Sequence, residues 1–430
     1  MTEDIHKEKG IRPERGEGGT APSNGTFRAF ANRNYTRLWM ANCQIYTCRW
    51  MQMTLLTWLI LELTDSPWKV ALVGFFYVGP TLLLGLAGGV LADEMDRRRL
   101  LIMSNAVSVV ASLWLTVLLL TGEVQVWQAY LTAAINGASW AISFASRRAL
   151  IFDFLGSSGV TNAMALDTVG MNISRMIGPG LSGVLITLTG VAGGYVVVTV
   201  SYALGIILLW ILHIGEPFQR EIKQRNVFRN LLEGFRYIRE TPSIMAIVWI
   251  TVVMNFFLFS YPLMVPVMAR DVLHVGPTLM GFMQAAEGVG AMFGAYLLAA
   301  SVRIKYHGRY FLYGSLFALT ALCLFSLSRW YIFSCTILLS LGLGSSAFAT
   351  MQSTIVMLEA KADMRGRALG VVSLAIGAGP LGALLLGAIA DTVGPMFALR
   401  TNALLGILFV VFVAFMLPSI HNRTRTDDPV

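Results

Sequence analysis

The amino-acid sequence predicts an all-α membrane protein, with twelve transmembrane helices arranged as two pseudo-symmetric bundles of six. Of its 430 residues, 56% are hydrophobic and 13% are charged, and the mean hydropathy is +0.65. Soluble domains carry about 25% charged residues, so a chain with so few charges is expected to be covered by lipid. Twelve apolar segments are long enough to cross a bilayer, and a charged stretch separates the sixth from the seventh.

The predicted elements follow one another with short connections. Residues 1–36 form a polar tail without the apolar core of a cleavable signal peptide. The first bundle covers residues 37–214, the linker 215–243, the second bundle 244–418 and the C-terminal tail 419–430. The expected helices cover residues 38–61, 68–91, 100–121, 126–147, 163–188, 194–214, 244–268, 277–300, 310–328, 331–355, 367–390 and 395–417.

The placement of positive charge predicts the orientation. With the N-terminus in the cytoplasm, 26 of the 32 Lys and Arg residues fall on the cytoplasmic side, including Arg147 and Arg148 in the loop after the fourth segment. This asymmetry follows the positive-inside rule and places both termini in the cytoplasm. The net charge of +8 then reflects contact with anionic lipid. The basic and aromatic patch that binds nucleic acid is absent from the sequence, so no nucleic-acid partner is expected.

The linker is expected to contain an amphipathic helix on the inner surface of the membrane. It serves either as a simple connection between the bundles or as a regulatory lipid sensor. The apolar face of this helix consists of Val227, Phe228, Leu231, Leu232, Phe235 and Ile238.

The polar turn between the second and third segments, Gly89-Val90-Leu91-Ala92-Asp93-Glu94-Met95-Asp96-Arg97-Arg98-Arg99, is the most informative motif. Gly89 allows close helix packing, and Asp93 offers a carboxylate that can cap a helix or pair with an Arg. Arg97 and Arg98 hold the loop in the cytoplasm. The turn resembles the loop 2–3 signature of the major facilitator superfamily, Gly-x-Leu-Ala-Asp followed by a basic cluster. The resemblance implies a secondary transporter with two repeated halves.

Three further stretches resemble the bacterial branch of that superfamily that includes the enterobactin exporter. They are Trp50-Met51-Gln52 followed by Trp58–Pro67, then Met268–Leu273, and Met364–Gly370. The likeness runs from about residue 28 to residue 418 and implies an integral protein of the bacterial inner membrane, monomeric by default. Cargo does not follow from it, because one fold serves many substrates.

The fifth segment carries Gly178-Pro179-x-x-x-Gly183, which resembles the antiporter signature of the family. Pro179 removes a backbone hydrogen bond, and the glycines allow close packing and bending. The resemblance implies proton-coupled export, whereas a simple kink is the structural alternative. The Arg that the family often places early in the fourth segment is absent, because Ala133 stands three residues before Asn136.

Charges inside apolar segments are the best candidates for function, because each is costly in lipid unless it is paired or hydrated. Arg49 lies near the middle of the first segment, where it either binds an anionic part of the cargo or bonds to carbonyl groups as a structural residue. Arg175 and Glu287 lie in the fifth and eighth segments, with Gln284 one turn before Glu287. These two segments face each other in the family, which implies that Arg175 and Glu287 can meet. Glu287 is then the leading proton carrier, and a static structural pair is the alternative.

The resemblance implies that segments one, four, seven and ten line a central cavity. Most aromatic residues of membrane helices serve packing, so this set is expected to act as a whole. Together its residues predict a mixed apolar and aromatic cavity for a small amphipathic organic compound, siderophore-like or drug-like, and Arg49 favours an anionic one. The candidate substrate-binding residues are Arg49, Tyr46, Gln52, Asn136, Trp140, Asn255, Tyr261 and Gln352.

The sequence therefore predicts an exporter driven by protons. An importer or a lipid transporter of the same fold remains an alternative, as does a membrane receptor or scaffold without turnover. An enzyme is not expected, because no nucleophile–base pair, metal-ligand cluster or phosphate-binding loop is visible. No catalytic residue, metal or cofactor is therefore assigned.

Overall fold

The computed structural model describes residues 27–212, 227–300, 306–361 and 364–422. Within these ranges the chain is helical and contains no strand. The predicted tail up to residue 26, the linker from 215 to 226 and the tail from residue 423 lie outside the described residues.

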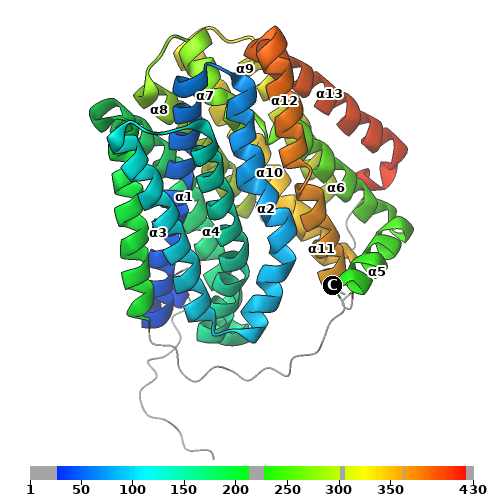
Figure 1. Cartoon of the computed structure of the whole chain (residues 1–430). Helices are drawn as coiled ribbons and strands as arrows, with labels where there is room; N and C mark the ends of the chain where they lie inside the picture. The colour runs from blue at the N-terminus through cyan, green and yellow to red at the C-terminus, as the bar shows by residue number, and fades with distance from the viewer. Residues whose placement is uncertain (1–26, 213–226, 301–305, 362–363, 423–430) are drawn as a thin grey trace, which may run out of the picture.

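The described elements consist of α-helices and of short 3-10 and π-helical pieces, which are labelled η (Figure 1). In chain order they are η1 Arg28–Ala31, α1 Arg33–Thr64, α2 Pro67–Glu94, α3 Arg97–Thr121, α4 Val126–Trp210, α5 Val227–Glu240, α6 Pro242–Val253, η2 Met254–Leu258, η3 Tyr261–Met264, α7 Val265–Val267, η4 Met268–Val272, α8 Pro277–Ala300, α9 His307–Phe325, α10 Tyr331–Glu359, α11 Arg365–Ile376, α12 Gly379–Val393, α13 Pro395–Met416 and η5 Pro418–His421.

Each predicted membrane segment falls largely on helical residues, which confirms the all-α membrane fold class. α1 and α8 contain the charged residues Arg49 and Glu287, and neither is among the helices that pass the length and hydropathy criteria for a membrane span. The helical stretches that are long and apolar enough to cross a membrane are seven among the described residues: Arg97–Thr121, Gly159–Trp210, Pro242–Val272, His307–Phe325, Tyr331–Glu359, Arg365–Val393 and Pro395–Met416.

α4 contains three membrane segments because the chain reverses twice within it. The backbone leaves the helical region at Gly156 (φ 61°) and at Gly190 (φ 70°). Both positions combine positive φ with extended ψ, a region that essentially only glycine adopts. We call the three parts the first arm (before Gly156), the second arm (between the two glycines) and the third arm (after Gly190).

The seventh and eleventh segments, each predicted as one membrane span, are interrupted. The seventh passes from α6 through η2, η3 and α7 to η4, with Pro262 and Pro266 at the starts of new elements. The eleventh divides into α11 and α12 just before Pro380. Since proline donates no backbone hydrogen bond and clashes with the preceding turn, each interruption has a local cause.

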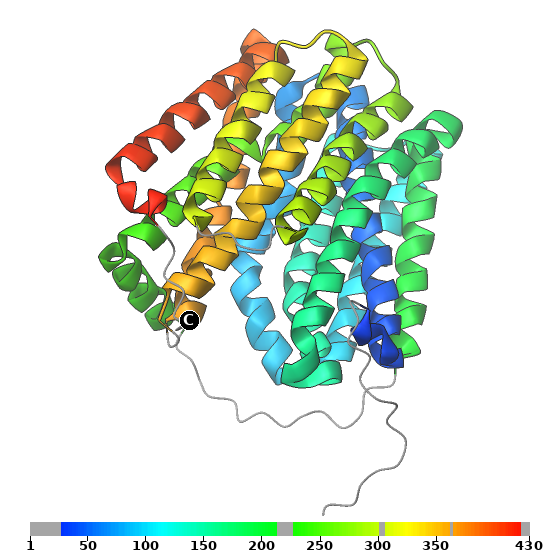
Figure 2. The same ribbon diagram turned by 180° about the vertical axis from the view of Figure 1, so that it is seen from behind.

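The helices pack as two halves. In the first, α1, α2 and α3 surround the arms of α4, and in the second, α10 packs on α8 and α9, and α13 on α9. The halves meet where α4 contacts α8 and where α2 contacts α12. We call the end at which α1 begins and α5 lies the linker end, and the other the far end. Both views show the halves diverging towards the linker end, where α11 packs on α5, α6 and α10 of its own half (Figures 1 and 2).

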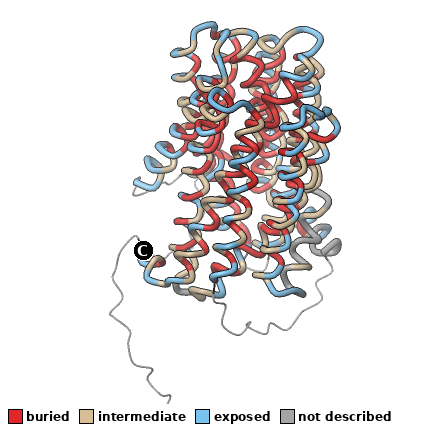
Figure 3. The backbone as a smooth tube through the Cα atoms, turned by 60° about the vertical axis from the view of Figure 1, so that its left-hand side comes forward, coloured by how far each residue is buried: buried red, intermediate tan, exposed pale blue. Residues whose placement is uncertain are grey.

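Buried residues concentrate along the axis of the molecule, and exposed residues cover its outer faces (Figure 3). Many of these exposed residues are large and apolar: Leu188 is 74% exposed, Ile332 80% and Phe415 79%. A soluble protein rarely leaves so much apolar surface in water, so lipid is the solvent that fits these faces.

The predicted amphipathic helix of the linker is confirmed as a helix, α5, and it packs against α11. Arg367 of α11 forms an ion pair of 3.0 Å with Glu233, and the backbone N–H of Lys361 donates to the Tyr237 hydroxyl at 3.1 Å. Ile238 is buried. The rest of the predicted apolar face divides into Leu232 and Phe235, which are exposed, and Val227, Phe228 and Leu231, whose side chains are not described.

Candidate functional site

The second arm of α4 and α8 cross at closest approach through glycines. A Cβ atom at Gly183 would overlap the carbonyl oxygen of Pro277, and one at Gly281 would overlap the carbonyl oxygen of Pro179. Gly288 of α8 is also close to the second arm, since a Cβ there would lie 3.0 Å from Cα of Met176. The Gly-Pro element predicted from the sequence therefore lies at the contact between the two halves, where small residues let helix backbones approach.

One ion pair bridges the halves beside this crossing. Nη2 of Arg175, in the second arm of α4, lies 2.7 Å from Oε1 of Glu287 in α8. The Glu287 side chain is 5% exposed and that of Arg175 is 22% exposed. The Ser345 hydroxyl of α10 donates to the same carboxylate oxygen at 3.3 Å, and the Arg175 guanidinium lies 5.4 Å from the Trp50 ring centroid. The pairing expected from the sequence is thus present, and both charges are balanced within an apolar contact.

A second polar link joins the same two halves one turn away. The Thr54 hydroxyl of α1 donates to Oε1 of Gln284 at 2.8 Å. Because Gln284 and Glu287 are three residues apart on α8, they share one face of that helix. This face of α8 therefore carries both of these polar contacts, and Thr278 at the start of α8 adds a third to Thr187 and Gly183 of the second arm.

At the far end, charged residues hold the halves together at their helix termini. Nη1 of Arg270 in η4 donates to the Leu61 carbonyl at 3.0 Å and pairs with Asp65 at 2.7 Å, where α1 ends. Asp391 of α12 accepts from the Ser66 hydroxyl at 2.6 Å and from a backbone N–H at the start of α2. We call this set of contacts the far-end clasp.

A polar cavity lies within the first half. It is small, and its lining includes Arg49, Tyr77, Asn136, Trp140 and Arg147. The Arg49 guanidinium stacks on the Trp140 ring, with 3.8 Å between its carbon and the ring centroid, and lies 5.2 Å from the Tyr77 ring centroid. Arg49 therefore has an aromatic cage for its charge.

The expected position of Arg147, in a cytoplasmic loop, is wrong. The structure places it in the first arm of α4 with 1% exposure, because the helix continues past it to Gly156. Its Nη1 donates to Asn42 at 3.0 Å, and Asn42 in turn donates to Asp167 at 2.9 Å. The Tyr46 hydroxyl donates to the other oxygen of Asp167 at 3.0 Å. This buried network was missed, although Asp167 lies inside the predicted fifth segment and was itself a signal.

The chain matches the family of transmembrane secretion effectors of the major facilitator superfamily over residues 24–428. It belongs to this family. Three relatives with similar sequences are the staphyloferrin A transporter of Staphylococcus aureus (24% identical, covering 84% of this chain and 90% of that one), the multidrug efflux pump Tap of Mycolicibacterium fortuitum (24%, 86% and 92%) and the enterobactin exporter EntS of Escherichia coli (23%, 86% and 88%).

A solved structure supports the major facilitator fold of this transporter. It is a bacterial homologue of the human lysosomal transporter Spinster in an inward-facing and occupied conformation, with a TM-score of 0.70 and 15% identity. The match covers 90% of this chain and 97% of that chain. At this identity the likeness shows the fold, which agrees with the superfamily resemblance drawn from the sequence motifs.

The remaining candidate binding residues of the transporter lie in two places. Gln52 is fully buried in the first half, with Nε2 3.4 Å from the Ser112 hydroxyl, and does not lie among the cavity lining. In the second half, Gln352 donates to the Thr251 hydroxyl at 2.7 Å, and Asn255 donates to the Thr251 carbonyl at 2.9 Å.

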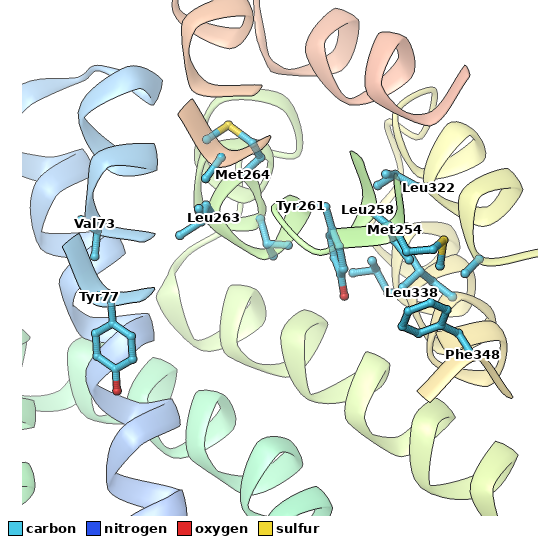
Figure 4. Packing of buried hydrophobic residues seen from close by; sticks show 14 of the residues in the cluster. Val73, Tyr77, Met254, Leu258, Tyr261, Leu263, Met264, Leu322, Leu338 and Phe348 are labelled. Carbon is cyan, nitrogen blue, oxygen red and sulfur yellow. The ribbon is translucent and has the colours of Figure 1, made fainter. Parts of the chain in front are cut away.

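Tyr261, the last candidate, lies at the start of η3 and is 3% exposed. It belongs to the packed residues of the second half, near Leu263, which faces α2 of the first half (Figure 4). On the other side of that contact, Val73 and Tyr77 extend from α2 (Figure 4). Tyr261 and Tyr77 therefore lie on opposite halves.

The loop motif of the transporter is described only in part. Gly89 and Asp93 lie in the last turns of α2, where side chains are not described. Arg97 forms an ion pair with Asp153 in the first arm of α4. Arg98 donates to the carbonyl groups of Leu209 and Trp210 at the end of the third arm. Arg98 thereby satisfies the open carbonyl groups at a helix C-terminus.

Weakening the far-end clasp by Arg270→Gln is expected to favour separation of the halves at that end. Partly exposed ion pairs are worth about 0.2–1 kcal/mol, so the open population should rise by up to about fivefold. The measurement is the rate at which an impermeant maleimide labels Leu263→Cys, a residue 5% exposed beside α2, in a protein whose four native cysteines are serine. Arg400→Gln, which removes an Arg stacked on Phe397 in α13, is the matched control. Equal labelling in both variants would contradict the role of the clasp.

Proposed function

We propose that this transporter is a proton-coupled exporter of a small amphipathic organic compound, siderophore-like or drug-like. It works as a monomer of twelve transmembrane helices in the bacterial inner membrane, with both termini in the cytoplasm. The first bundle covers residues 37–214 and the second 244–418, joined by the cytoplasmic linker 215–243 and flanked by tails 1–36 and 419–430. The linker end then faces the cytoplasm, and the arrangement is open to the inside.

The observation that carries the proposal is the Arg175–Glu287 pair between the halves. A charged pair at the contact of two moving bodies couples their separation to protonation. When Glu287 is ionised, its attraction to Arg175 holds the second arm of α4 against α8. When Glu287 takes up a proton, the attraction is lost and the contact weakens. Uptake or release of a proton by Glu287 can therefore drive the transporter from one access state to the other.

Alternating access in this account is a rocking of the halves about the contacts of α4 with α8 and of α2 with α12. These are the contacts that join the halves in the structure. Gly178, Pro179 and Gly183 allow the second arm of α4 to bend and to slide on α8. The far-end clasp must break for cargo to leave, and its helix-terminal ion pairs are weak enough to do so.

The nature of the cargo is inferred from residues that line the cavity of the first half. Arg49, Trp140 and Asn136 offer one positive charge, one aromatic face and one amide, which suits an amphipathic anion. The names of the three relatives, a staphyloferrin A transporter, an enterobactin exporter and a multidrug efflux pump, support the same class of cargo. The names of the exporter and the efflux pump support the outward direction.

A thermal-shift screen tests the cargo class. Purified protein is heated with siderophores, dyes, antibiotics and lysolipids, since a ligand that binds the folded state stabilises it in proportion to the logarithm of its concentration over its dissociation constant. We expect at least one siderophore or drug to stabilise the wild type and to lose this effect in Arg49→Ala. Arg148→Ala, whose exposed Arg stacks on Phe144, is the matched control. A hit retained by Arg49→Ala would make Arg49 structural, and the absence of any hit would argue against a transporter of such compounds.

A further inference from the structure

The polar cavity of the first half is separate from the contact between the halves. Its lining residues come from α1, α2, α3 and the first and third arms of α4, all within the first half. Among them, Arg49 and Trp140 are half-buried and the others are buried. The Arg49–Trp140 stack therefore marks the side on which the cavity opens.

Two guanidinium groups point into this cavity, and its lining contains no carboxylate among the residues that the structure describes. Arg147 uses Nη1 for Asn42, but its buried Nε has no hydrogen-bond partner. The contacts of the Arg49 guanidinium are the aromatic faces of Trp140 and Tyr77. Asp167, the nearby acid, accepts from Asn42 and Tyr46, lies outside the cavity lining and forms no ion pair with Arg147. The cavity therefore has an excess of positive charge.

Neutral donors surround the two cations. The hydroxyl groups of Ser104 and Ser143 and the amide of Asn105 donate to carbonyl groups of their own helices. Ser108 and Ser139 also line the cavity. A serine hydroxyl can turn its hydrogen towards an incoming acceptor, so the wall offers rotatable donors to an anion. Buried unpaired donors and charges are costly, and an oxyanion satisfies both.

We propose that this cavity is a subsite for the carboxylate of an organic acid, held between Arg49 and Arg147 with an aromatic or apolar part against Trp140 and Tyr77. The proposal rests on the proposed function, because the rest of the cargo extends from the Arg49–Trp140 side towards the space between the halves. The enclosed space admits about one water-sized group, so it fits the carboxylate itself, and the rest of the compound lies on the Arg49–Trp140 side.

Calorimetric titration of the purified full-length protein with benzoate tests the subsite, with benzamide as the neutral isostere. We expect saturable benzoate binding in the wild type and none with benzamide. Charge-assisted hydrogen bonds are worth about 1.5–3 kcal/mol, so Arg49→Gln should weaken benzoate binding by about tenfold or more. Ser108→Val, which fills the cavity without changing charge, should do the same. Arg148→Gln removes the neighbouring positive charge outside the cavity and should leave binding unchanged.

Three results would overturn the proposal. Unchanged benzoate affinity in both Arg49→Gln and Ser108→Val would place benzoate elsewhere. Equal binding of benzamide would show that charge is not recognised. Binding of inorganic phosphate but not of benzoate would assign the cavity to a free oxyanion instead of the cargo. Reconstituted transport is measured separately: if these variants behave as expected while the wild type moves no compound under a pH gradient, the proposed function fails and the subsite stands.

Discussion

Glu287→Gln is expected to leave the transporter folded but to reduce its response to a pH gradient by about tenfold or more, the loss that a barrier increase of about 1.4 kcal/mol produces. Glutamine has nearly the same shape and can still accept from Arg175 and Ser345, so the contact between the halves is kept. It cannot take up or release a proton. The measurement is transport of a screen hit into proteoliposomes, with and without a pH gradient, alongside exchange of the same compound across the membrane without one.

We expect the variant to exchange cargo across the membrane at the wild-type rate, while a pH gradient no longer accelerates its transport. Glu62→Gln is the matched control, because Glu62 is an exposed carboxylate in α1 that accepts from Trp58 of its own helix. A Glu287→Gln protein that follows the gradient as the wild type does would show that the Arg175–Glu287 pair is only structural.

Gly183→Val is expected to force the second arm of α4 away from α8 and to stop transport. A side chain at this position would meet the Pro277 carbonyl oxygen and the backbone of Gly281, neither of which can move without shifting α8. Overpacking of this kind typically costs about 1–3 kcal/mol, and here the cost falls on the contact between the halves. The measurements are thermal stability in detergent and transport in proteoliposomes.

Gly180→Val separates this effect from helix propensity. Gly180 lies in the same arm of α4, and a Cβ there would meet only the Phe282 ring at 3.8 Å, an ordinary contact. We expect Gly180→Val to keep most of the transport activity. If both variants behave alike, the loss comes from valine in the helix and not from the crossing of Gly183 with Gly281.

The helical segments were predictable because composition and hydrophobic run length determine where a chain can cross lipid. The interruption of the seventh segment was not predicted, although Pro262 and Pro266 are visible in the sequence. A proline in an apolar run signals either a kink or a new start, and the neighbouring helices decide between them.

The site was predictable where charge stood out from its surroundings. Arg175 and Glu287 each interrupt an apolar run, and two such charges of opposite sign are expected to form an ion pair. Arg147 was missed because it stands beside Arg148, and two adjacent arginines at the end of a segment are typical of a cytoplasmic loop. Only the tertiary structure shows that Arg147 faces inwards towards Asn42 while Arg148 is exposed.

The residues that were expected to line the cargo site lie in different environments, and only the tertiary structure shows which residue lies where. Gln52 is buried against α3 and the third arm of α4, whereas Arg49 of the same helix enters the cavity. They are three residues apart, so both belong to broadly the same face of α1. Sequence spacing cannot separate a residue that packs within a half from one that opens towards cargo.

The most direct test of the central claim is proton movement by the wild-type protein itself. Proteoliposomes are loaded with a membrane-impermeant pH-sensitive dye, and a compound from the thermal-shift screen is added outside at zero membrane potential. We expect that movement of the compound in one direction changes the internal pH as protons move in the other, and that Glu287→Gln abolishes the change. Transport of the compound with no change in internal pH would contradict proton-coupled exchange.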